Sequence, residues 1–522
     1  AGTNIVLTYS QDKPLLSEIR GGYVGHTIQA IPTLEQYDAN QTGGYGALYG
    51  DVVNLYNPLG MVDDNLMNRY SDNVKIFANA YVSVEFMKGL KYKLNLTPDF
   101  QFYRYNSYLG LYDYGLNKND ITQVTEQQTR TRNVLVENLL TFDRTFGDHK
   151  ISVLAGYTYQ DSRYRYMQGS GQGMPTGIKE IDAAAQGLAV SGNSSRSVLT
   201  SILGRAFYSY KNRYLLTATI RRDGSSKFGS NNRYGNFPSV SVGWNIAEED
   251  FVKNNTSWLD QLKLRGGYGV LGNQEIDNYQ YVSVVTTGIN YPDGKSGLIQ
   301  GAFPKTFANP DIKWEETAMT NIGIDFMALR NRLTLTADWY VKNTKDILLN
   351  VPIPISSGGA NDPIKNAGKI RNQGFEFNLG WNESLNKDLS YGVSFLGTYN
   401  KNEVVEMGAE SQSIIGGTIH GGTYTSKTLA GYPIGGFWLI PTDGYFNSAE
   451  EVQAYQKDGV LIQPSAAPGD IRFKDTNNDG TIDDDDRVYC GSPFPKFTYS
   501  INGNVTYKNV DFSIGFQGVS GN

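Results

Sequence analysis

Apolar and polar residues alternate at every second position along most of this chain. The alternation is clear in segments 90–96, 214–222, 332–341, 374–381 and 510–518. In the fourth of these, phenylalanine, leucine and tryptophan alternate with glutamate, asparagine and glycine. Because successive side chains of a strand point to opposite faces, each segment predicts a strand with one apolar face and one face of polar or small residues.

The connections between these strands differ in length at their two ends. Short turns such as YKNRYLL and TYKNVDF join strands at one end. Long polar stretches join them at the other end, and these are residues 168–196, 273–310, 352–370 and 402–470. Short turns on one side and long loops on the other are typical of an outer-membrane β-barrel.

The length of the alternating segments favours the same all-β architecture. They run for about 9 to 12 residues, which suits a tilted membrane crossing and exceeds the roughly five or six residues of most globular strands. Their apolar faces carry tyrosine, phenylalanine or tryptophan near the ends, where interfacial girdles occur. Roughly 14 to 18 strands would enclose a lumen wide enough for a solute, so the pattern indicates transport. The alternative is a string of soluble β-sandwiches, whose strands also alternate.

Composition narrows the functional classes. The chain has 522 residues, a formal net charge of -6 and a single cysteine. One cysteine excludes an intramolecular disulfide framework, and the absence of a lysine and arginine cluster argues against nucleic acid as a partner. The start, AGTNIVLTYS, has neither the charged nor the apolar region of a signal peptide, which predicts a mature start or an internal cut. No apolar run approaches the roughly 18 residues of a transmembrane helix.

The segment 475–486, DTNNDGTIDDDD, has the spacing of a calcium-binding EF-hand loop. Its oxygen-bearing side chains are Asp475, Asn477, Asp479, Thr481, Asp483 and Asp486. Gly480, at the sixth place, permits the sharp turn, while an aspartate in place of glutamate at the twelfth predicts weaker or six-coordinate binding. Both flanks read as extended chain, so we expect structural calcium and no calcium switch, which needs a helix pair to open. A solvated acidic turn is the alternative.

No catalytic constellation emerges from the sequence. The glycine pattern of 267–272 follows a strand but lacks the helix that a dinucleotide site needs. His26, His149 and His420 are scattered and are expected to be surface or lumen residues. Cys490 is expected to be a small apolar filler. Neither G-x-S-x-G nor H-E-x-x-H occurs, so the sequence predicts that the protein is not an enzyme.

Two loop features each allow two interpretations. The segment 221–229, RRDGSSKFG, predicts a hairpin loop whose Asp-Gly pair supplies the turn, or a loop whose two arginines and Lys227 face a solute path. The long loops also carry isolated aromatic residues, namely Tyr424, Trp438, Tyr445 and Tyr455. These rings either form loop core, which we favour, or contact sugars or a lid protein.

Several long blocks resemble the SusC/RagA-type TonB-dependent transporters of Bacteroidota outer membranes. They include RRDGSSKFG with NRYGNFPSVSVGWNIAEEDF, LKLRGGYGVLGNQEI, NPDIKWEETAMTNIGIDF, DWYVKNTKDILL, NAGKIRNQGFEFNL and the block from GDIRFKDTNNDGTIDDDD to FQG. They occur in the family's order across residues 55–522. The resemblance implies a 22-stranded barrel, of which residues 1–522 are expected to be a part. The plug domain, the TonB box and the last strands are expected to lie outside this sequence.

The resemblance further implies active import across the cell outer membrane. A SusD-like surface lipoprotein would cap the barrel, and TonB would act through an N-terminal region that this sequence lacks. Outer-membrane lipid, a glycan or peptide substrate and a dimer of barrel–lid pairs are implied as partners. The loop 475–486 would then be a calcium clip within an extracellular loop. A passive porin-like channel and a secreted calcium-stabilised glycan-binding β protein are the alternatives.

Overall fold

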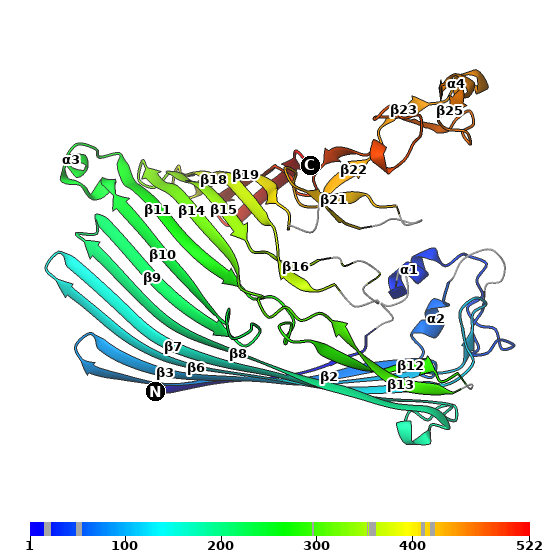
Figure 1. Cartoon of the computed structure of the whole chain (residues 1–522). Coiled ribbons are helices and arrows are strands. Elements are labelled where there is room, and N and C mark those ends of the chain that lie inside the picture. Colours follow the sequence, from blue (N-terminus) through cyan, green and yellow to red (C-terminus); the bar gives the residue numbers. More distant parts are fainter. Residues whose placement is uncertain are drawn as a thin grey trace. The chain divides into compact units, whose positions relative to one another are not determined.

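The computed structural model describes residues 1–14, 22–47, 55–294, 297–351, 353, 356, 362–408, 413–417 and 423–522. Most of these residues form strands (Figure 1). The α-helices are short and are α1 (Gly22–Gln29), α2 (Pro58–Met61), α3 (Asp250–Lys253) and α4 (Ala449–Ala454). Within the described ranges no helix has both the length and the apolar character that a membrane crossing requires.

One large antiparallel sheet dominates the structure. Its described strands number fifteen, in the order β1-β2-β3-β6-β7-β8-β9-β10-β11-β14-β15-β18-β19-β28-β29. The first half comprises β1 (Gly2–Asp12), β2 (Met67–Met87), β3 (Leu90–Leu109), β6 (Gln123–Phe146), β7 (His149–Gln172), β8 (Gln186–Tyr210) and β9 (Tyr214–Ser225). The second half comprises β10 (Tyr234–Asn245), β11 (Leu259–Asn273), β14 (Glu315–Ala328), β15 (Leu333–Lys345), β18 (Lys369–Ser384), β19 (Leu389–Glu406), β28 (Phe497–Tyr507) and β29 (Val510–Ser520). The predicted all-β class and strand number are confirmed.

The chain forms two compact units. The first contains Ala1–Thr141, Ala155–Ile202 and Gly224–Ser226, and the second contains Phe142–Leu154, Leu203–Asp223 and Lys227–Asn522. In the first unit β1 pairs with β2 and β2 with β3. In the second unit antiparallel pairing runs without interruption from β10 to β29.

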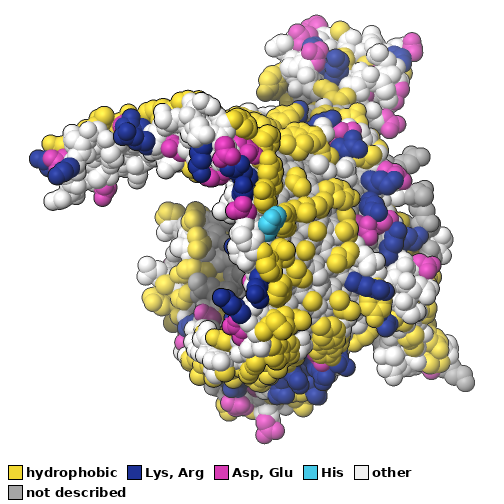
Figure 2. All heavy atoms as spheres, turned by 90° about the vertical axis from the view of Figure 1, so that its left-hand side faces the viewer, with side chains coloured by type: hydrophobic (Ala, Val, Ile, Leu, Met, Phe, Trp, Pro, Cys, Tyr) yellow, Lys and Arg dark blue, Asp and Glu magenta, His cyan; other side chains and the backbone are white. Residues whose placement is uncertain are grey.

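The second unit shows how the alternation sorts side chains. One row across five neighbouring strands consists of Leu335, Leu379, Phe395, Ile501 and Phe516, each paired with the next. The adjacent row on the opposite face consists of Thr334, Gly380, Ser394, Asn502 and Gly515. Leu379, Ile501 and Phe516 of the apolar row are exposed, at 42%, 42% and 60%, and Leu335 and Phe395 are half-buried. Figure 2 shows hydrophobic side chains gathered over a broad part of the surface, as a face that meets lipid requires.

The strand ends differ from the prediction. β6, β7 and β8 contain 24, 24 and 25 residues, about twice the predicted length. Beyond the apolar zone both faces are polar, as in QVTEQQTRTR at the start of β6, so the period-two signal fades while the backbone ladder continues. The predicted long loop 168–196 therefore has only residues 173–185 between β7 and β8.

The remaining loops contain small sheets of their own. A hairpin of β12 (Val284–Pro292) and β13 (Leu298–Thr306) lies within the predicted loop 273–310. The long connection after β19 carries a four-stranded sheet of β20 (Ser413–Ile415), β21 (Ser426–Leu429), β22 (Gly436–Leu439) and β27 (Val488–Gly491). Further two-stranded sheets are β4 (Tyr112–Asp113) with β5 (Lys118–Asn119), β16 (Leu348–Asn350) with β17 (Ile364–Asn366), β23 (Thr442–Tyr445) with β26 (Ile471–Phe473), and β24 (Gln456–Lys457) with β25 (Val460–Leu461).

Buried apolar side chains gather in and beside these loops. Phe228, Ile312 and Phe446 are almost completely buried and all lie outside the strands of the large sheet. In the first unit a cluster of Met61, Leu66, Met67, Tyr112 and Tyr114 lies where α2, the start of β2 and β4 meet. The long loops are therefore packed structures that can present side chains in fixed positions.

A lysine on the apolar face should destabilise the folded barrel more than a lysine on the polar face. At about 3.3 Å per residue along a tilted strand, Leu379 lies roughly 15 Å from the short turn 385–388, near the middle of a membrane crossing. Leu379→Lys should therefore cost about 2–4 kcal/mol. Asn378→Lys, on the opposite face at the adjacent position, should cost less than about 1 kcal/mol. Urea unfolding from lipid vesicles measures both, and equal losses would contradict the assignment of the faces.

Candidate functional site on the polar face and in the loops

An ion network lies on the polar face of the second unit. Arg265 of β11 donates two hydrogen bonds to the Asp338 carboxylate of β15, at 2.5 and 2.6 Å. Its Nε also lies 3.2 Å from both carboxylate oxygens of Asp325 of β14. Gly323 makes room between them, because a Cβ there would lie 2.6 Å from both Arg265 and Asp338. The sequence places these residues on the polar face, but only the strand register brings them together.

A cavity of about 330 Å³ adjoins this network, and its lining mixes polar side chains with apolar ones such as Phe207 and Leu215. Its lining includes Thr217, Ser241, Lys263, Arg265 and Asn321, from strands β9, β10, β11 and β14. These side chains offer hydroxyl, amide and cationic groups, which can hydrogen-bond a polar solute or another protein segment.

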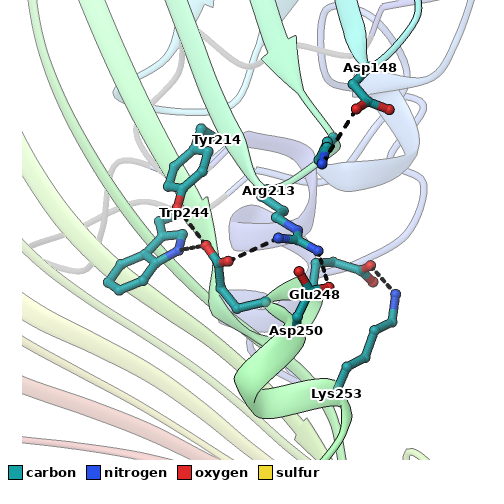
Figure 3. A network of polar contacts seen from close by, with 9 residues as sticks. Asp148, Arg213, Tyr214, Trp244, Glu248, Asp250 and Lys253 are labelled. Carbon is teal, nitrogen blue, oxygen red and sulfur yellow. Dashed lines mark hydrogen bonds and ion pairs between the residues drawn. The ribbon is translucent and has the colours of Figure 1, made fainter.

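A second ion network ties two short connections together at the other ends of the strands (Figure 3). Arg213, in the turn between β8 and β9, contacts Glu249 at 3.2 Å and Asp250 at 2.5 Å. The Glu249 carboxylate also accepts hydrogen bonds from the Tyr214 hydroxyl at 2.6 Å and the Trp244 indole at 3.0 Å. These bonds lower the pKa of Glu249, first through Tyr214 and then through Trp244. The network therefore fixes the β8–β9 turn against the connection that contains α3.

The segment 221–229 serves mainly to anchor structure. β9 extends to Ser225, so the Asp-Gly pair lies within the strand and the predicted turn at that pair is wrong. Arg221 bonds Asp223 at 2.7 Å, and Arg222 lies 4.8 Å over the Tyr234 ring. Phe228 is fully buried and packs 5.1 Å from Trp314, measured between ring centroids.

The loop 475–486 curls in its first half as its spacing predicts. Asp475 accepts hydrogen bonds from the backbone N–H groups of Asp479 and Gly480 at 3.2 and 2.8 Å. Asn477 accepts one from Asp479 at 2.9 Å, and Asp479 accepts two from Thr481 at 2.7 and 2.8 Å. Gly480 has a φ of +95°, which glycine adopts without strain. These four oxygen donors therefore lie around one tight turn, as calcium ligands must.

The second half of the loop fits a cation less well. Asp486 is fully buried, and its carboxylate accepts backbone hydrogen bonds from Thr476 at 2.6 Å and Asp483 at 3.0 Å. The Asp483 carboxylate accepts one from Asp485 at 2.8 Å. Across the described parts of the chain, no three acidic, histidine or cysteine side chains converge closely enough to hold a metal ion. Calcium in this loop therefore stays a prediction.

Arg487, directly after the loop 475–486, connects the loop to neighbouring segments. Arg487, whose side chain is only 8% exposed, donates to Asp484 at 2.8 Å and to the Trp438 carbonyl at 3.2 Å. Its guanidinium lies 4.4 Å from the centre of the Tyr424 ring. The loop lies between β26 and β27, so the predicted helix-free flanks are confirmed. A single 3-10 turn occupies Asp484–Asp486.

The aromatic residues singled out in the loops separate into two groups. Tyr424 stacks beneath Arg487, Trp438 packs 4.9 Å from the Tyr432 ring, and Tyr455 packs 5.8 Å from the Phe446 ring. Tyr445 is 62% exposed. Most of these rings therefore form loop core, and Tyr445 is the one of the four that points outward for a ligand or partner.

The loops of the second unit also enclose an apolar cavity of about 540 Å³. Its lining includes Leu349, Val351, Ile370, Val404 and Ile434. It lies among β16, β17, β18 and β19 and the small sheet that follows. No pattern in the sequence predicts this cavity, because its walls come from separate segments of the chain.

Among the residues that the structure describes, His26, His149 and Cys490 do not gather into a site. His26 is buried, and its Nδ1 accepts a hydrogen bond from the Tyr56 backbone at 3.2 Å, so the expectation of a surface or lumen residue is wrong. His149 bonds the Tyr208 hydroxyl at 2.7 Å, and His420 lies outside the described residues. Cys490 is exposed, which contradicts its expected role as a buried filler.

Comparison with known proteins gives consistent results. The family model "TonB dependent receptor-like, beta-barrel" matches residues 21–520. TonB-dependent receptor P3 of Formosa agariphila is 29% identical over 510 residues, covering 95% of this chain and 49% of that protein. TonB-dependent receptor SusC of Bacteroides thetaiotaomicron is 33% identical over 334 residues, covering 62% of this chain and 31% of that protein.

A solved structure shares the fold. The RagAB peptide transporter superposes with a TM-score of 0.77 at 22% identity, covering 93% of this chain and 52% of that chain. The chain spans about half the length of the curated Formosa relative and of this solved chain.

The network around Glu249 should make stability depend on pH. Because the folded state lowers the pKa of Glu249, its stabilisation is present above the unfolded pKa of about 4.3 and is lost as the pH falls through the folded value. The wild type should therefore be more stable than Glu249→Gln at pH 7, and the difference should shrink below about pH 4.3. Glu248→Gln, whose side chain is 45% exposed, is the matched control. A difference that persists unchanged at low pH would contradict this role.

Proposed function

Because this chain belongs to the TonB-dependent receptor β-barrel family, we propose that it forms the barrel of an importer that takes up oligomeric nutrients. Proteins of this family lie in the outer membrane and are transporters, so the chain is an outer-membrane transport protein and not an enzyme. In this proposal TonB supplies the energy for import, and a SusD-like surface lipoprotein forms the lid of the barrel. A dimer of barrel–lid pairs would be the working assembly.

The main support for this proposal is that apolar side chains lie on one face of the large sheet and polar side chains on the other. In the second unit the outer face carries an apolar row from β15 to β29, while the inner face carries the Arg265 network and a cavity lined in part by hydroxyl, amide and cationic groups. A plug domain from a longer protein would meet this inner face, where charged and amide groups can bond it reversibly. TonB would then act on the plug and open the polar path.

Two features of the loops bear on the substrate class that we propose. The cavity of about 540 Å³ is lined mainly by aliphatic side chains, and most of the four loop aromatic rings named above are packed into loop core. Sugar recognition generally uses exposed aromatic faces and polar groups, whereas an aliphatic cavity suits the apolar side chains of a peptide. Glycans and oligopeptides are both candidates, and this cavity favours oligopeptides.

Energy coupling separates the proposal from a passive channel. In cells that carry the whole protein, uptake of a fluorescent oligopeptide or oligosaccharide should stop when TonB is removed or a protonophore is added. Uptake that continues under either condition would favour the porin-like alternative.

Affinity purification in detergent should recover a surface lipoprotein with the barrel. A protein that is soluble without detergent would favour the secreted glycan-binding alternative.

We also propose that the loop 475–486 binds calcium as a structural clip. Asp475, Asn477, Asp479 and Thr481 supply the first donors, and Asp483 and Asp486 complete the set named by the spacing. An ion that binds only the folded loop stabilises it in proportion to the logarithm of ligand concentration.

Calcium should therefore slow proteolysis within this loop. Trypsin cleavage after Lys474 should be at least about fivefold slower in calcium than in chelator, since a site filled well above its Kd gains about 1 kcal/mol or more. Asp475→Ala should abolish the difference, and Asp485→Ala, an exposed residue outside the donor set, should preserve it. Equal rates with and without calcium in the wild type would refute the site.

A further inference from the structure

A groove on the apolar side of the first unit combines arginines with apolar residues. It has a volume of about 440 Å³ and is formed by strands β2, β3, β6 and β7. Its cationic lining residues are Arg104, Arg130 and Arg165, and its apolar ones include Val74, Phe102 and Met167. Three arginines from three different strands therefore converge on one groove.

The groove opens on the side that faces lipid. Phe102 is 41% exposed and lies on the same face of β3 as Leu94 and Leu96, because even-numbered residues share that face. Val74 pairs directly with Phe102, and Arg104 is the next residue of β3 on this face. The Arg130 guanidinium lies 5.5 Å from the Phe102 ring centre, which places it on the same surface.

The three arginines stand at nearly the same height. Arg104 lies in the last third of β3, counted from the short turn that precedes the strand. Arg130 and Arg165 line the same groove as Arg104, and the Arg130 guanidinium lies 5.5 Å from the Phe102 ring centre. At about 3.3 Å per residue and a tilt of about 40°, Arg104 and its neighbours in the groove lie roughly 35 Å above the short turn that precedes β3. This is beyond a hydrocarbon core of about 30 Å, in the headgroup layer on the side of the long loops.

Acidic side chains neutralise only part of the positive charge of the three arginines in the groove. Arg104 pairs with Glu126 at 3.0 Å. Asp72, the acidic lining residue, accepts hydrogen bonds from Tyr9 and Gln11 at 3.1 Å each. Neither Arg130 nor Arg165 forms an ion pair with an acidic side chain among the residues that the structure describes. The groove therefore has spare positive charge at the depth where lipid phosphates lie.

We propose that this groove binds the phosphate of an anionic lipid in the outer leaflet. Guanidinium groups bind phosphate with paired, charge-assisted hydrogen bonds, which suits Arg130 and Arg165. The acyl chains of the lipid would lie below, along the apolar face that carries Leu94 and Leu96. The competing explanation is that these are ordinary interfacial arginines that reach the headgroup layer singly.

Native mass spectrometry of the whole purified protein can separate the two explanations. The probes are lipid A with its phosphates, the same glycolipid after dephosphorylation, and inorganic phosphate as a competitor. Retention of lipid A should fall about tenfold or more in Arg130→Gln and in Arg165→Gln, because each loses a charge-assisted hydrogen bond. The dephosphorylated glycolipid should bind weakly and equally to every variant.

The matched control is Arg371→Gln. Arg371 lies near the start of β18, on the same face as Phe375, and it does not line the groove. Its height above the short turn after β18 is similar to the height of Arg104 above the short turn before β3. This variant should retain lipid A like the wild type. An equal loss in all three variants would overturn the proposal in favour of single interfacial arginines, as would retention that does not depend on the lipid phosphate. If millimolar inorganic phosphate binds as well without lipid, a free anion site replaces the lipid site. Heat-dependent migration on a gel confirms that each variant is folded.

Discussion

Backbone hydrogen bonding is the constraint on which the rest of this structure depends. A chain that crosses hydrocarbon must pair every backbone N–H and C=O group internally, because no water is present to do so. The antiparallel ladder meets this requirement from β10 to β29 with few register shifts. Once the ladder is fixed, alternate side chains must face opposite sides, and the apolar rows must all face the same way.

Because the two faces differ in this way, polar side chains along the membrane crossing lie on the face that is turned away from lipid. In the second unit Arg265 lies on the inner face, where Asp325 and Asp338 from neighbouring strands neutralise it. Other polar groups lie at the strand ends, where Arg213 and Glu249 join two short connections. Both networks are hydrogen-bonded as well as charged, so each compensates the desolvation of its members. The long loops build small aromatic cores of their own, such as Phe228 with Trp314 and Phe446 with Tyr455. An aliphatic cavity lies between other loop residues and the ends of β18 and β19.

The sequence by itself determined the strands, their two faces and the ends that carry short turns and long loops, because all three follow from local alternation and turn residues. It also determined the family, since long blocks stand in one order. The sequence did not predict where β6, β7 and β8 end, because the alternation of apolar and polar residues stops where both faces of a strand meet water. The burial of His26 and the exposure of Cys490 were also not predicted, because both depend on segments far away in the chain.

Only the tertiary structure decided which polar residues meet. Arg265 and Asp338 are separated by 73 residues and become partners through the register of three strands. The arginine groove likewise requires strands β3, β6 and β7 to lie together at one height. The spacing of 475–486 identified candidate ligands, yet the orientation of Asp486 toward backbone N–H groups was decided by its burial against the chain around it. Local pattern fixes which face a side chain occupies, whereas its neighbours there depend on pairing between segments far apart in the chain.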